Sequence, residues 1–242
     1  MWRVWQSLGE SLYFFRRHFF TLARLLLPLV LPLFLLAEYR VFVVLHGDDK
    51  LVNQDVLLLF ANALIGLYAI AVTTVYAVTE LDGGQLPVGS LLLRAFLALP
   101  SLLALQLLMF IALLLVSTLI VVPGVWLLVM LPGLWLLSCL MPACVYVVAE
   151  RQPVPVALRN SFMNFRGLAW QLMAALLLVS LGLFLPVVAG ATALSDLIGK
   201  LPSLPGRMLL SALADAFALL LSQLWPVVLV RYYDMLRRGE VA

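Results

Sequence analysis

The chain has 242 residues, of which 65% are hydrophobic and only 11% are charged, and its formal net charge is +3. Soluble domains are close to half apolar and about a quarter charged, so this composition excludes an ordinary soluble protein. No basic run of the kind that binds nucleic acid is present either. A helix that spans a bilayer uses about 20 apolar residues. Six such helices leave only short loops, so we expect an all-α, polytopic membrane protein with a single integral membrane domain over residues 1–242.

The elements follow one another in a simple order, with short amphipathic surface helices placed before some of the spans. Residues 1–18 mix apolar positions at helical spacing with charges such as Glu10 and Arg16, as in a helix that lies on a membrane surface. Two further surface helices are predicted at about 90–99 and 155–166. The six predicted spans are about 20–39, 55–78, 101–122, 126–148, 168–191 and 208–230.

Prolines interrupt this pattern at two informative places. Pro28 and Pro32 fall inside the first span and predict a kink or a break, because each removes a backbone hydrogen-bond donor. Pro123 and Gly124 predict a tight turn between the third and fourth spans, since proline presets one turn angle and glycine accepts a positive one.

The distribution of positive charge predicts how the protein sits in the membrane. With six spans both termini share one side, and 11 of the 15 basic residues fall on it. The other side holds four, namely Arg40, Lys50, Lys200 and Arg207. Cytoplasmic loops carry the excess of lysine and arginine, so we expect both termini inside the cell.

Asp215 is the clearest candidate for a functional polar site within the membrane. It follows Arg207 by eight residues, which places it about 12 Å along a helix. Asn62 enters its own span from the same side at a similar depth, so the two side chains are possible partners. They either line a polar cavity that binds a proton, a cation or a headgroup, or they join helices by hydrogen bonds. Gln106, Gln171 and Gln223 lie in the inner half of the membrane, where they either line an inner vestibule or form hydrogen bonds between helices.

Basic and aromatic residues alternate around the third predicted surface helix. Arg151, Arg159 and Arg166 accompany Phe162 and Trp170. Arginines of this kind contact anionic lipid headgroups while aromatic rings enter the interface, although the positive-inside rule alone also places arginines here. We therefore name the three arginines as candidate headgroup contacts, with anionic lipids of the cytosolic face as the expected partners.

The sequence contains no recognisable catalytic motif. No nucleophile elbow, zinc motif or phosphate loop is present. His46, Asp48, Asp49 and Asp55 share one loop, but their spacing matches no specific metal site. We expect no catalytic residues, no cofactor and no bound metal ion.

Several short motifs resemble the YciC-like inner-membrane proteins of Gram-negative bacteria, an uncharacterised family. The motifs are Val121-Val122-Pro123-Gly124, Pro142-Ala143 leading to Val148-Ala149-Glu150, Ala157-Leu158-Arg159-Asn160-Ser161 and Arg231-Tyr232-Tyr233-Asp234-Met235-Leu236-Arg237, with Phe14-Phe15-Arg16 in the opening helix. The resemblance implies a multi-pass protein of the bacterial inner membrane. It implies no reaction, ligand or catalytic residue.

These observations favour a non-enzymatic membrane protein concerned with envelope lipid or membrane homeostasis. Two alternatives stay open. One is a small transporter with a polar cavity around Asp215 and Asn62, and the other is a scaffold subunit of a membrane complex whose partner the sequence does not identify.

Overall fold

The computed structural model describes residues 2–41, 53–84, 86–120, 126–201 and 203–239. These residues form helices and include no strand, which confirms the all-α prediction. The helices are α1 (Trp2–Tyr39), α2 (Asn53–Leu81), α3 (Val88–Ile120), α4 (Trp126–Leu140), α5 (Ala143–Ala149), α6 (Val154–Phe165), α7 (Ala169–Lys200), α8 (Leu204–Ser222) and α9 (Leu224–Arg237).

Six stretches of the described chain are helical, long and apolar enough to cross a membrane, as the sequence predicted. They are Trp5–Tyr39, Val56–Leu81, Val88–Leu114, Pro132–Ala149, Ala169–Leu194 and Leu204–Arg237. In the most apolar 18 residues of each stretch, only 11% to 50% of the window is buried within the protein. Apolar helices that leave this much surface uncovered suit a lipid environment.

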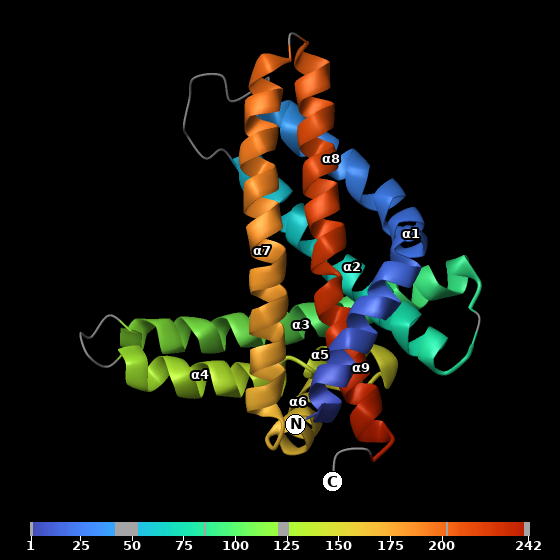
Figure 1. Cartoon of the computed structure of the whole chain (residues 1–242), viewed down its shortest axis with the longest axis vertical. Coiled ribbons are helices and arrows are strands. Elements are labelled where there is room, and N and C mark those ends of the chain that lie inside the picture. The colour runs from blue at the N-terminus through green and yellow to red at the C-terminus, as the bar shows by residue number, and fades with distance from the viewer. Residues whose placement is uncertain (1, 42–52, 85, 121–125, 202, 240–242) are drawn as a thin grey trace.

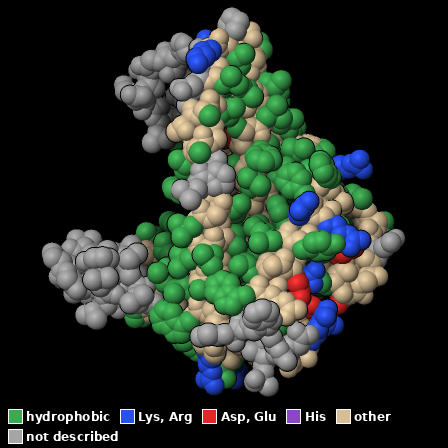
Figure 2. Space-filling model, viewed as in Figure 1, with side chains coloured by type: hydrophobic (Ala, Val, Ile, Leu, Met, Phe, Trp, Pro, Cys, Tyr) green, Lys and Arg blue, Asp and Glu red, His purple; other side chains and the backbone are tan. Residues whose placement is uncertain are grey.

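Two helical arms diverge from a shared base (Figure 1). The base consists of the first half of α1 together with α5, α6 and α9, and both chain ends lie beside it. The α7–α8 arm stands upright in this view, whereas the α3–α4 arm runs across it. Apolar side chains cover much of both arms, and most of the charged side chains visible in Figure 2 lie toward the base and α1.

Two of the three predicted surface helices are not separate elements. Residues 1–18 and the first span form the single helix α1, which continues through Pro28 and Pro32 and bends along its length without breaking (Figure 1). Residues 90–99 likewise belong to α3, which continues through Pro100. A proline removes only one hydrogen bond of a helix, so flanking turns can keep the helix continuous. Only α6 stands alone as predicted.

The fourth and sixth predicted spans are each divided in two. Pro142 ends α4 because it has no N–H to donate to Ser138, and the chain turns before α5 begins at Ala143. Pro226 has the same effect on the carbonyl of Ser222, and Gln223 separates α8 from α9. The predicted turn at Pro123 and Gly124 lies outside the described residues.

One buried core joins the base to the lower part of both arms. α1 packs mainly against α8 and α9, and α2 packs against α3 and α9. The largest completely buried side chains include Tyr232, Phe165 and Leu172. At the division between α8 and α9, the Thr73 hydroxyl donates a hydrogen bond of 3.1 Å to the buried Gln223 Oε1. Gln223 therefore joins two helices, whereas Gln106 is exposed on α3.

Candidate functional site

The strongest candidate site is the segment 150–170 at the base, which we call the α6 elbow. Its helix begins after Pro153, whose backbone is extended, and a second proline occupies the first turn. Ala157, Ser161 and Phe165 recur every four residues and are completely buried. The Ser161 hydroxyl donates a 2.6 Å hydrogen bond to the carbonyl of Cys139, which holds α6 against the end of α4. One face of the helix is therefore fixed, and the opposite face is free.

The free face of α6 alternates apolar and basic side chains. Val156, Arg159, Met163 and Arg166 follow one another at spacings of three, four and three residues, which places them on one side of a helix. All four are exposed, and Trp170 at the start of α7 is 53% exposed. Among the residues that the structure describes, neither Arg159 nor Arg166 forms an ion pair. This combination of unpaired cations and exposed apolar groups suits a membrane interface.

Arg151 occupies an unusual backbone conformation in front of α6. Its φ angle of 54° lies in the left-handed region, which costs a residue with a side chain about 1–2 kcal/mol. Hydrogen bonds on both sides hold it there, because the backbone N–H groups of Glu150 and Gln152 both reach the carbonyl of Tyr146, at 3.2 and 3.3 Å. The side chain of Arg151 is exposed and, like the other two arginines, forms no ion pair with a described residue.

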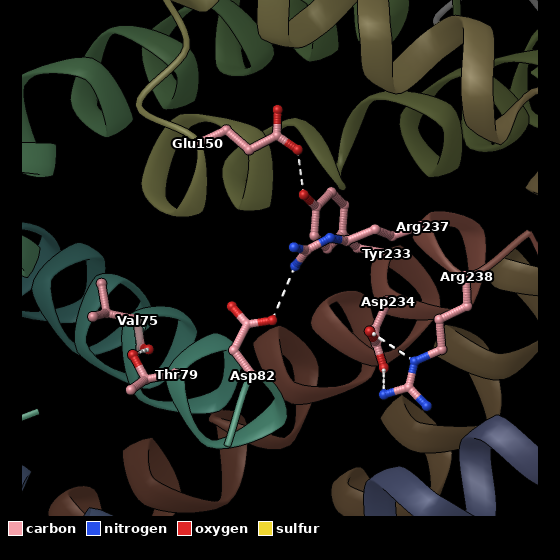
Figure 3. A network of polar contacts seen from close by, with 8 residues as sticks. All are labelled: Val75, Thr79, Asp82, Glu150, Tyr233, Asp234, Arg237 and Arg238. Carbon is pink, nitrogen blue, oxygen red and sulfur yellow. Dashed lines mark hydrogen bonds and ion pairs between the residues drawn. The ribbon is translucent and has the colours of Figure 1, made fainter. Parts of the chain in front are cut away.

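A polar network anchors the α6 elbow to α9 and α2 (Figure 3). The Tyr233 hydroxyl of α9 donates to the Glu150 carboxylate, and Arg237 donates to Asp82, which follows α2, at 3.0 Å. Both side chains of that ion pair are more than half exposed, so it contributes at most about 1 kcal/mol. The network orients the elbow by means of several weak contacts.

A cavity of about 440 Å³ lies behind the same elbow. Asn160 donates to Gln152 at 2.9 Å, and Asn164 donates to the Tyr146 hydroxyl at 2.8 Å. These lining groups already bond to one another. The polar groups of the cavity wall therefore already have hydrogen-bond partners, and we assign to this wall the role of positioning α6.

Asp215, the predicted intramembrane acid, lies on α8 beside an apolar groove of about 570 Å³ between α7 and α8. Its partner comes from a residue that the sequence analysis missed. The carboxyl group of Glu38, near the end of α1, interacts with both Asp215 and Ser211. Asn62 is not brought into this pair, and its buried Oδ1 has no hydrogen-bond partner among the described residues. The sequence does contain a signal for Glu38, because it is an acidic residue within the predicted first span at a depth similar to that of Asp215.

The remaining predicted sites give no further candidate. The described residues contain no group of three or more side chains that could hold a metal ion. The loop with His46, Asp48 and Asp49 lies outside the described residues. The chain matches no family model, no curated protein and no solved structure.

Proposed function

We propose that this chain is a non-enzymatic, multi-pass protein of the bacterial inner membrane whose α6 elbow binds anionic lipid headgroups at the cytosolic face. The observation that carries the proposal is the free face of α6, where Arg159 and Arg166 alternate with Val156 and Met163. A soluble surface would place acids beside such arginines, whereas the surface of an anionic membrane supplies the counter-charge itself. The role that follows is in envelope lipid or membrane homeostasis.

The proposed orientation agrees with the charge distribution. The start of α1 and the end of α9 lie at the base (Figure 1), and most of the arginines belong to the segments that form the base. Placing the base at the cytosolic face satisfies the positive-inside rule, and it sets α6 at the level of the lipid headgroups. The resemblance to the YciC-like proteins supports the same location.

The magnitude of the expected lipid interaction follows from the number of unpaired charges. A basic residue close to an anionic membrane surface contributes about 1 kcal/mol, so three arginines contribute about 3 kcal/mol. This corresponds to a loss of lipid affinity of about 100-fold when all three charges are removed. The exposed apolar residues beside the arginines keep α6 at the interface whether or not the three charges are present.

The proposal predicts that changing Arg151, Arg159 and Arg166 together to Gln removes bound anionic lipid from the purified protein. Native mass spectrometry in detergent, with added phosphatidylglycerol as the probe, measures the bound lipid directly. The matched control changes Arg16, Arg17 and Arg94 to Gln, since these exposed arginines carry the same charge outside the elbow. Equal loss in both variants, or no saturable binding by the unchanged protein, would contradict the proposal. A co-purifying protein in place of lipid would favour a scaffold subunit.

Transport is the second candidate function, and the interaction of Glu38 with Asp215 specifically favours it. Two carboxyl groups that interact between membrane-spanning helices form a candidate site for a proton or a cation. The adjacent groove is apolar, and α1 is not broken at its prolines, so among the described residues the acid pair is the observation that favours transport.

If the protein transports protons or cations, Asp215→Asn and Glu38→Gln should each abolish the flux while leaving the fold intact. Proteoliposomes containing a pH-sensitive dye, tested in Na⁺ and K⁺ gradients, report that flux. Asp82→Asn is the control, because this exposed acid lies at the base, away from the pair. Unchanged flux in both variants would exclude the acid pair as the coupling site.

A further inference from the structure

A separate cavity of about 400 Å³ lies at the base between the first turns of α1 and the end of α9. Its polar lining includes Glu10, Arg231, Asp234 and Arg238, two acids and two bases whose charges sum to zero. Its volume is within the range of cavities that bind small ligands, about 300–1,000 Å³. The lining belongs to α1 and α9, so this cavity is distinct from the α6 elbow and does not depend on the function proposed for it.

Only one acid and one base of this cavity are already paired. Arg238, which follows α9, forms an ion pair of 2.8 Å with Asp234 of that helix. Glu10 accepts a single long hydrogen bond of 3.3 Å from Gln6, and it forms no ion pair with Arg231 or with any other described residue. The cavity therefore presents one available carboxylate and one available guanidinium, held apart on different helices.

Arg231 is held in place by its surroundings and lacks an acceptor. Its guanidinium carbon lies 5.1 Å from the centre of the Phe14 ring, and that ring is in turn stacked on His18 at 4.4 Å and contacts Tyr76 at 6.4 Å. The Nε of Arg231 is buried and has no hydrogen-bond partner among the described residues. A buried donor without an acceptor is costly, so a ligand that supplies an acceptor to Arg231 would relieve a penalty already present in the protein.

We infer that this cavity binds a zwitterion that carries a phosphate and a primary ammonium group, that is, a phosphoethanolamine group. The phosphate pairs with Arg231, whose planar donors match phosphate oxygens. The ammonium pairs with Glu10, which lies on the facing helix. A simple anion would leave the carboxylate unpaired, and a simple cation would leave the guanidinium unpaired. Arg231 directly follows the last apolar stretch, so the group can belong to a membrane lipid or to a soluble molecule.

The test measures binding of free O-phosphoethanolamine by calorimetry, and of phosphatidylethanolamine by native mass spectrometry, to the full chain in a non-ionic detergent. A charge-assisted hydrogen bond contributes about 1.5–3 kcal/mol, so Glu10→Gln should weaken binding by about 10- to 100-fold. The same variant should leave binding of phosphatidic acid, which has no ammonium, unchanged. Arg231→Lys should weaken binding of both lipids, because the bidentate geometry is lost.

Two comparisons make the outcome decisive. Phosphocholine has no ammonium N–H, so it should bind more weakly than phosphoethanolamine. The variant Glu80→Gln should behave like the unchanged protein, because this exposed acid lies outside the cavity.

Binding of the lipid alone assigns a membrane ligand, and binding of the free headgroup assigns a soluble one; both support the inference. Absence of saturable binding, or equal affinity in Glu10→Gln and the unchanged protein, would overturn it. Glu10 is exposed, so its variant keeps the fold.

Discussion

Phe165→Ala should destabilise the base more than any change on the surface of α6. Phe165 is completely buried and is one of the largest buried side chains in the described chain. Removing a buried phenyl ring leaves a cavity that costs about 3–5 kcal/mol. Because Phe165 closes the last turn of α6, the same change should also loosen the helix that carries Arg159 and Arg166.

The melting temperature in detergent, followed by tryptophan fluorescence, measures this effect. Met163→Ala is the control from the same helix, since Met163 is 52% exposed and its removal leaves no internal cavity. We expect a large fall in melting temperature for the first variant and almost none for the second. Equal melting temperatures would show that α6 is not anchored through Phe165.

Ala216→Leu should separate α8 from α1. Ala212 and Ala216 lie one helical turn apart and are both almost completely buried, and α8 packs more extensively against α1 than against any other described helix. Small residues at this spacing let two helix backbones approach closely. Extra methylene groups in such a contact cost about 1–3 kcal/mol and push the helices apart. The change should therefore also weaken the interaction of Glu38 with Asp215.

Ala104→Leu provides the matched control for this prediction, because Ala104 is exposed on α3 and the identical substitution there meets no neighbouring helix. A cross-link between cysteines introduced at exposed positions of α1 and α8 would report their separation. If cross-linking and melting temperature are unchanged in Ala216→Leu, the close approach of the two helices would be disproved.

The long apolar stretches could be predicted because their signal is local. Each span depends on about 20 successive residues, so the described helices recover all six. The ends of helices were predicted less well, since Pro28, Pro32 and Pro100 continue their helices whereas Pro142 and Pro226 divide theirs. Whether a proline stops a helix depends on what satisfies the carbonyl it leaves unpaired, and that partner comes from elsewhere in the chain.

The candidate site residues show the same difference between local signals, which could be predicted, and contacts between distant residues, which could not. Arg151, Arg159 and Arg166 were identified from one short segment, and the structure places them on one exposed elbow. Asp215 was identified by its charge in an apolar helix, but its predicted partner Asn62 does not bond to it. Depth along a helix can be counted from the sequence, whereas the direction in which each helix faces its neighbours cannot.

By itself, the sequence determined that this chain is helical, with six stretches long and apolar enough to span a membrane and a basic segment at 150–170, because hydrophobicity, helix length and charge are properties of neighbouring residues. Only the tertiary structure decided which distant side chains meet. The interaction of Glu38 with Asp215, and the unpaired Glu10 and Arg231 that face one cavity, both depend on how α1 packs against α8 and α9. That packing depends on complementary shapes such as the small faces of Ala212 and Ala216, and no local pattern specifies which faces come together.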